Sequence, residues 1–136
     1  MEALDLGIPL ALVSEAVFAR CVSALVDERQ AASTVFTHDN TGVNPRDETD
    51  DAALIDDLKD ALLASKIVSY AQGFVMLSAA SKEYDWNLNY GDIALMWRGG
   101  CIIRSVFLGN IRNAFDANPN LSNLMTDSYF AQLLIR

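Results

Sequence analysis

Apolar residues recur at helical spacing along the first third of the chain. Gly7-Ile8-Pro9 is a break followed by a start, because proline is favoured in the first turn of a helix. From there to about residue 32, a spacing of three to four is kept by Leu10, Val13, Val17, Cys21, Ala24 and Leu25. The pattern predicts one amphipathic helix that ends in the polar "DERQ" turn.

The next stretch, "STVFTHDNTGVNPRDETD" (residues 33–50), carries turn-forming residues and few apolar ones. Asn-Thr-Gly and Asn-Pro are typical of loops, so a surface loop is predicted here. His38 and Arg46 lie in it, and both are expected to be solvated side chains.

A second helix is predicted from about residue 51 to residue 84. Thr49 or Asp50 can cap it, and an acidic residue at position 51 suits its first turn. Leu54, Leu58 and Leu62 lie one turn apart, which makes the first half amphipathic. The second half, residues 67–80, is apolar nearly all round, which predicts burial on several sides. We therefore expect a central post of the domain or part of a subunit interface.

The remaining pattern predicts shorter helices. Asn89 and Asp92 resemble a capping box ahead of a helix through "IALMW". Gly99-Gly100 then indicates a bend or a close backbone contact, with a helix continuing over 101–117. Asn118-Pro119 begins a short helix, and Thr126-Asp127 caps a last one running to the end of the chain. No alternating β-branched strand is visible, so the predicted fold is all-α with a long central helix, in one domain over residues 1–136 that includes the 33–50 loop.

Charge narrows the set of partners. The 136 residues carry 18 acidic and 10 basic side chains, for a formal net charge of −8. That balance argues against nucleic acid and anionic membranes as partners, and any bound anion must be held by a local group of arginines. The apolar window 61–80 contains Lys66 and Gln72 and lacks basic flanks, so it is interpreted as a core helix and not as a membrane span.

The cysteine and histidine content argues against metal and triad chemistry. Cys21 and Cys101 stand far apart without a CxxC spacing, and His38 is the only histidine. A zinc site and a histidine-based triad are therefore not expected. The two cysteines are instead expected to be buried, reduced thiols. The opening "MEALDLGIPL" has acids where a signal peptide has bases, so a cytoplasmic location is expected.

Arg20 stands out as a permanent cation inside the first apolar helix. A guanidinium offers a fork of donors to phosphate oxygens. The small residues on its helical face, such as Ala16 and Ser23, would let a ligand approach. Spacing alone leaves two readings open, a phosphate ligand or a salt bridge to an acid such as Glu15 or Asp27.

Other polar residues carry weaker signals. Arg98 and Arg104 flank the glycine pair and could bind phosphate, or form ion pairs with acids such as Asp92 or Glu83. Polar contacts inside the core or across a dimer interface are the default for Lys66, Tyr70 and Gln72. Packing is the default for Trp86, Trp97 and Phe107.

Four blocks of the sequence closely resemble 6-phosphogluconate dehydrogenase, the decarboxylating enzyme of the pentose phosphate pathway. They are "EAVFAR" (15–20), "ASKIVSYAQGF" (64–74), "LNYGDIALMWRGGCIIRSVFLGNI" (88–111) and "NPNLSNLMTDSYF" (118–130). The resemblance covers the chain except the 33–50 loop. It implies part of the family's all-helical C-terminal domain.

The resemblance also implies what other parts of such an enzyme supply. Family members bind NADP with a Rossmann domain, and none of the seven glycines here forms a GxGxxG turn. The family's catalytic lysine and glutamate and its C-terminal tail are likewise expected outside these residues. No catalytic, cofactor-binding or metal residue is therefore assigned to this chain, which is expected to be inactive alone.

One functional residue carries over. Arg20 matches the family arginine that binds the sugar phosphate of 6-phosphogluconate, the substrate that the intact enzyme converts to ribulose 5-phosphate with NADP. A homodimer is also implied. Without the other walls of that site, an ion pair is expected as the state of Arg20 here.

A second hypothesis is a non-catalytic helical self-association module. Strongly apolar surfaces favour association of this kind.

Overall fold

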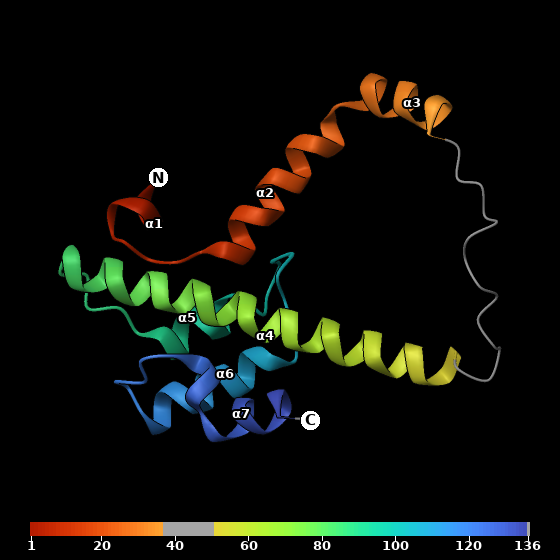
Figure 1. Cartoon of the computed structure of the whole chain (residues 1–136). Helices are drawn as coiled ribbons and strands as arrows, with labels where there is room; N and C mark the ends of the chain where they lie inside the picture. The colour runs from red at the N-terminus through yellow and green to blue at the C-terminus, as the bar shows by residue number, and fades with distance from the viewer. Residues whose placement is uncertain (37–50, 136) are drawn as a thin grey trace. The chain divides into compact units, whose positions relative to one another are not determined.

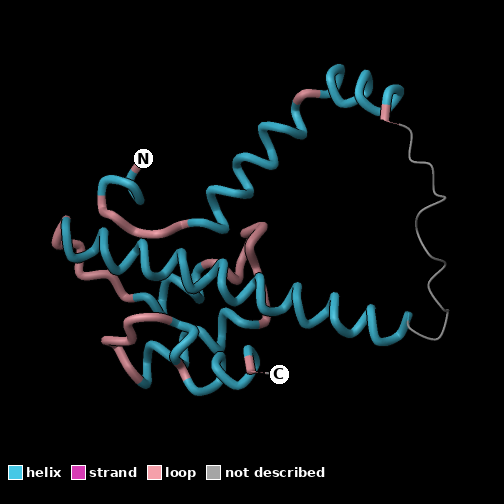
Figure 2. Tube along the Cα trace, viewed as in Figure 1, coloured by secondary structure: helices cyan, strands magenta, loops and turns pink. Residues whose placement is uncertain are grey.

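The computed structural model describes residues 1–36 and 51–135, and all regular structure in these ranges is helical (Figures 1 and 2). The helices are α1 (Glu2–Asp5), α2 (Ala11–Ala24), α3 (Val26–Val35), α4 (Asp51–Glu83), α5 (Tyr90–Met96), α6 (Phe107–Ala117), the 3₁₀ helix η3 (Leu124–Thr126) and α7 (Ser128–Leu134). The predicted all-α fold with one long helix is confirmed.

The contacts divide the chain into two compact units. Unit 1 comprises Met1–Leu10 and Ala64–Arg136, and unit 2 comprises Ala11–Leu63. The single helical domain expected over residues 1–136 stays a prediction.

Residues 11–35 of unit 2 form two helices, α2 and α3, where the sequence predicted one. The backbone leaves the helical region at Leu25 (φ −79°, ψ 63°), which separates α2 from α3. No glycine or proline marks this break. Residues 33–35, predicted as loop, form the last turn of α3, and the rest of the predicted loop lies outside the described residues. No residue of α2 or α3 is buried.

The long helix α4 agrees closely with its predicted bounds, while its proposed caps, Thr49 and Asp50, lie outside the described residues. Ile67, Ala71 and Phe74, at i, i+4 and i+7, are buried, and the other residues of 67–79 are half-buried. No position from 67 to 81 is exposed, which agrees with the burial on several sides that was predicted for this half of the helix.

An aromatic cluster forms the centre of unit 1. The Phe74 ring lies 5.1 Å from the Phe115 ring, 5.4 Å from Trp97 and 6.4 Å from Tyr90, measured between centroids. Tyr90 and Phe115 are themselves 5.2 Å apart. These offset and edge-on contacts are favourable for aromatic rings, and they join α4, α5 and α6 into one layer of packing.

Polar caps fix the ends of the short helices in unit 1. The Asn89 side chain accepts from the Asp92 amide at 3.1 Å and donates to the Asp92 carboxylate at 2.8 Å, which confirms the predicted cap. Asp127 caps α7 as predicted, through the amides of Tyr129 and Phe130. Each such cap satisfies amide donors that the first turn of a helix leaves unpaired.

The segment between α5 and α6 departs from the prediction. Residues 97–106 form turns, so the helix expected from residue 101 begins only at Phe107. Gly100 has φ +76°, a left-handed conformation that glycine adopts without strain. The chain thus bends at the glycine pair, and the helix expected at Asn118-Pro119 is likewise a turn, followed by η3.

One described helix, α4, is long and apolar enough to cross a membrane by length and composition alone. Core helices pass the same test, and Ile67, Ala71 and Phe74 of this helix pack inside unit 1.

The aromatic cluster generates a prediction about stability. Truncating a buried phenylalanine removes apolar contacts and leaves a cavity, so Phe74→Ala should lower the free energy of unfolding by about 3–5 kcal/mol. Phe36, which is 78% exposed, provides a matched control, and Phe36→Ala should change it by less than about 0.5 kcal/mol. Urea unfolding followed by circular dichroism measures both. Equal effects of the two substitutions would contradict the packing described here.

Candidate functional site

Arg20, the predicted substrate ligand, lies on the exposed surface of α2. Its Nη1 atom donates a hydrogen bond to Ser23 Oγ at 3.0 Å. The same hydroxyl donates to the Arg20 carbonyl oxygen at 2.8 Å. Ser23 therefore tethers the guanidinium to the helix one turn further on, while the other guanidinium nitrogens remain available to a ligand.

The ion pair expected for Arg20 is not formed with any described residue, since the ion pairs of the described ranges involve other cations. The local geometry explains this. Glu15 is five residues away and so does not share the i±3 or i±4 face of Arg20. Asp27 lies beyond the helix break at Leu25 and enters α3 in a different direction.

A second arginine, which the sequence did not single out, converges on the same serine. Arg29 of α3 donates from Nη1 to the Ser23 carbonyl oxygen at 2.9 Å. The break at Leu25 makes this possible, because it frees that carbonyl from a regular helical partner. Two guanidinium groups thus share Ser23, an arrangement suited to a doubly charged anion.

Neither Arg98 nor Arg104 forms an ion pair with Asp92, Glu83 or any other carboxylate among the described residues. Both line a hollow of about 400 Å³ together with Ser105 and Val106. Asp92 pairs instead with Arg112 at 3.6 Å, and Asp116 accepts from Arg112 Nε at 3.0 Å. The hydrogen bond and charge of Asp116, with a smaller effect of Asp92, raise the pKa of the Arg112 guanidinium.

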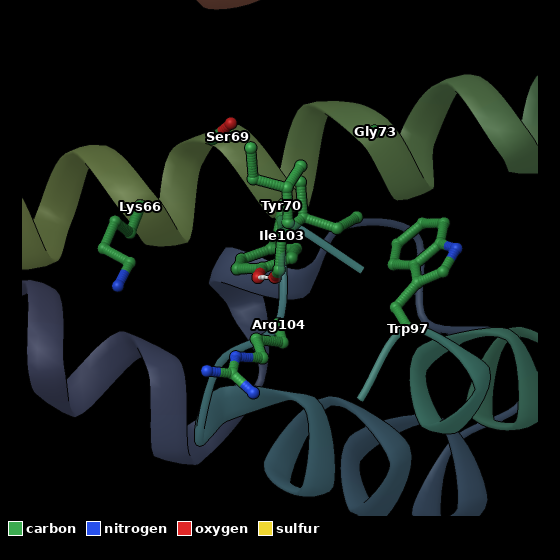
Figure 3. A pocket seen from close by; sticks show the side chains of 8 residues that line it. Lys66, Ser69, Tyr70, Gly73, Trp97, Ile103 and Arg104 are labelled. Carbon is green, nitrogen blue, oxygen red and sulfur yellow. Dashed lines mark hydrogen bonds between the residues drawn. The ribbon is translucent and has the colours of Figure 1, made fainter. Parts of the chain in front are cut away.

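A cavity of about 340 Å³ lies between one face of α4 and the 97–106 segment (Figure 3). Lys66, Ser69, Tyr70 and Gly73 of α4 line it, opposite Trp97 and Arg104. The polar contact predicted for Tyr70 exists, because its hydroxyl donates to the Ile103 carbonyl oxygen. Lys66 is exposed at this cavity, so it makes no contact inside the core, and the alternative of a contact across a dimer interface stays a prediction.

Burial affects the chemistry of Tyr70. Desolvation raises the pKa of its phenol, and a hydrogen bond with Ser105 lowers it by a smaller amount. The neutral phenol is thus favoured here, which preserves its donor hydrogen for the Ile103 carbonyl. This bond ties the 97–106 segment to α4.

The packing predicted for three aromatic side chains is confirmed, whereas the burial predicted for the two cysteines is not. Trp97 and Phe107 pack as predicted, on Phe74 and Phe130 respectively, and Trp86 packs on Tyr84 although it is 53% exposed. The expectation of two buried thiols is wrong, since Cys21 is exposed and Cys101 is half-buried.

His38 and Arg46 lie outside the described residues. Within residues 1–36 and 51–135, no three His, Cys, Asp or Glu side chains gather as a metal site would require.

A family model described as 6-phosphogluconate dehydrogenase, C-terminal domain, matches residues 1–136. The chain belongs to this family, as the sequence resemblance implied.

Relatives extend the match along the whole chain. The decarboxylating 6-phosphogluconate dehydrogenase of Dictyostelium discoideum is 58% identical over 135 residues, which cover 98% of this chain and 27% of that protein. The Ovis aries enzyme is 55% identical over 130 residues, 96% of this chain and 26% of that protein. The chain thus spans about 27% of the length of such relatives.

A solved structure supports the fold. Plasmodium falciparum 6-phosphogluconate dehydrogenase, described in its apo form, with its cofactor NADP+ and with its substrate 6-phosphogluconate, superposes with a TM-score of 0.87. The two sequences are 40% identical over 98% of this chain and 28% of that one.

The Tyr70 contact generates a prediction about pH. Because the folded-state pKa of this phenol is raised, its contribution to stability is complete below the unfolded value of about 10 and is lost as the pH rises through the folded value. Near pH 8, Tyr70→Phe should lower the free energy of unfolding by about 0.5–1.5 kcal/mol through the lost hydrogen bond.

Denaturant unfolding at a series of pH values measures this difference. The difference in the free energy of unfolding between wild type and Tyr70→Phe should narrow as the pH rises above about 10, the unfolded-state pKa of the phenol. A difference that stays constant above about pH 10 would show that Tyr70 ionisation is not coupled to folding.

Proposed function

We propose that this chain is the substrate-phosphate-binding portion of a 6-phosphogluconate dehydrogenase. The whole protein would oxidise 6-phosphogluconate with NADP and release carbon dioxide to give ribulose 5-phosphate. Arg20 is the residue of this chain that binds the sugar phosphate. The observation that carries the proposal is an exposed guanidinium that is tethered by a hydroxyl and has no carboxylate partner among the described residues.

The chemistry of the α2 surface suits a phosphate. A phosphate monoester carries about −1.5 to −2 charge near pH 7 and offers several acceptor oxygens. Arg20 presents its remaining guanidinium N–H groups to them, and Arg29 adds a second positive charge through its contact with Ser23. The chain has a net charge of −8, so an anion is bound favourably only where positive side chains such as Arg20 and Arg29 lie close together.

The contribution of this chain to the reaction is binding and not proton or hydride transfer. NADP supplies hydride acceptance when it is bound, and this chain offers no glycine-rich turn to receive it. Other parts of the protein would therefore bind the cofactor and carry the acid and base. The 136-residue chain alone should form no NADPH from 6-phosphogluconate.

Titration of the chain with 6-phosphogluconate tests the proposal. We expect weak binding, with a Kd of the order of 1 mM, detected by shifts of the α2 amide signals in nuclear magnetic resonance spectra. Arg20→Ala should weaken this binding by about tenfold or more, since a charge-assisted contact is lost. Gluconate, which lacks the phosphate, should cause no comparable shifts.

Lys59→Ala serves as the control. Lys59 is an exposed cation that pairs with Asp56 at 2.8 Å, so its removal matches the charge change without touching the arginine pair. Identical affinities of wild type and Arg20→Ala would remove the assigned role, and NADPH formation by the chain alone would show that a catalytic site has been overlooked.

A second function, self-association into a homodimer, is favoured by the apolar surface of α2. Val13, Val17, Phe18 and Val22 are 43–63% exposed. Apolar side chains gathered on one exposed helix are typical of protein interfaces. The proposed homodimer and the non-catalytic module both use this surface.

Multi-angle light scattering at micromolar protein distinguishes the states. We expect a mass near twice 14.9 kDa for wild type, and a monomer for Phe18→Asp, because a buried unpaired carboxylate is costly. Ile55→Asp, a change at a residue 64% exposed on α4, is the control and should leave the dimer intact. A clean wild-type monomer would contradict the proposal.

A further inference from the structure

The cavity between α4 and the 97–106 segment has features that neither packing nor the proposed phosphate contact of Arg20 explains. Its volume of about 340 Å³ lies within the range of small-molecule sites. All of its lining residues belong to unit 1, whereas Arg20 belongs to unit 2.

One end of the cavity is cationic. Lys66 and Arg104 extend on the same side of Tyr70 (Figure 3). Arg104 also borders the adjoining hollow that Arg98 lines. The ion pairs of the described ranges are made by Lys59 and Arg112, so these three cations have no carboxylate partner there. Their charges are available to an anionic group.

The other end is aromatic. The Trp97 indole lies across the cavity from Lys66 (Figure 3), and its contact with Phe74 at 5.4 Å fixes the ring position. Tyr70 lies between the two ends, with its hydroxyl bound to the Ile103 carbonyl. Flat heteroaromatic rings stack well on such a surface, at about 1–3 kcal/mol per ring for nucleobases.

The cavity wall is open where α4 carries Gly73. A Cβ atom built at Gly73 meets no atom within 4 Å. This position follows Lys66, Ser69 and Tyr70 at helical spacing on the same face, so the absence of a side chain leaves room beside Trp97. A glycine inside a helix costs about 1 kcal/mol relative to alanine, and here it leaves space for a ligand.

We propose that this cavity binds a small molecule in which a flat heteroaromatic ring carries a phosphate, the chemistry of a nucleoside monophosphate. Its ring lies against Trp97 and its phosphate lies between Lys66 and Arg104. The Tyr70–Ile103 hydrogen bond keeps the 97–106 segment in place, so the site exists before the ligand arrives.

Fluorescence titration with adenosine monophosphate tests the site. The full chain carries Trp86→Phe, so Trp97 is the only tryptophan left of the two. We expect saturable quenching with a Kd of the order of 1 mM. Adenosine and inorganic phosphate should each bind at least about tenfold more weakly, because each lacks one half of the contacts.

Three variants locate the binding. Arg104→Ala and Lys66→Ala should each weaken it by about tenfold, since a charged contact is lost. Gly73→Leu should abolish it by filling the open wall, and the thermal melting curve of this variant checks that it remains folded. Lys59→Ala, which removes an ion-paired cation from the same helix, should leave the affinity unchanged.

Several results would overturn the proposal. The first is the absence of saturable quenching up to about 10 mM adenosine monophosphate. The second is an affinity for adenosine equal to that for adenosine monophosphate. The third is an affinity for adenosine monophosphate that is unchanged in both Arg104→Ala and Lys66→Ala. Arg20→Ala should not alter nucleotide binding, and Arg104→Ala should not alter 6-phosphogluconate binding. The two proposals therefore succeed or fail separately.

Discussion

The packing of Phe74 against Phe115, Trp97 and Tyr90 is the contact on which unit 1 depends. One ring from α4 touches one ring from α6 and two from the ends of α5. Because aromatic side chains contribute large buried areas, this single point orients three helices at once. It also fixes the start of the 97–106 segment, since Trp97 is the residue that leaves α5.

That fixed start determines the shape of the cavity. From Trp97 the chain turns through Gly100 and returns to α4, where the Tyr70 hydroxyl holds the Ile103 carbonyl. A segment of turns carrying two arginines is thus held against a helix face by one aromatic contact and one hydrogen bond. The cationic side chains there, Lys66 and Arg104, are exposed, and no described carboxylate pairs with them.

Unit 2 follows a different principle. Its helices α2 and α3 bury no residue, and their apolar side chains remain largely exposed. Their defining feature is polar, the serine shared by Arg20 and Arg29 on either side of a helix break. A surface that combines exposed apolar residues with converging cations is suited to contact with other molecules more than to internal packing.

Much of the fold could be predicted from the sequence. The spacing of apolar residues gave the all-α class and the bounds of α4, and cap chemistry located the starts of α5 and α7. These are local properties, set by side chains three or four positions apart. The family, and with it the expected phosphate-binding role of Arg20, was also predicted from short contiguous blocks of residues.

Tertiary structure decided the rest. The break at Leu25, which brings Arg29 to Ser23, has no glycine or proline to announce it. Residues 101–106 resemble a helix by composition, yet they form turns, and the carbonyl of Ile103 among them accepts a hydrogen bond from the hydroxyl of Tyr70, 33 positions earlier in the chain. The hydrogen-bond and ion-pair partners of charged side chains likewise depend on distances between elements, which the sequence does not give. This holds for Arg20, Arg98, Arg104 and Asp92. The sequence determines which elements form and which charges they carry, whereas only the folded chain decides which of those charges meet, because such contacts join residues that are distant in sequence.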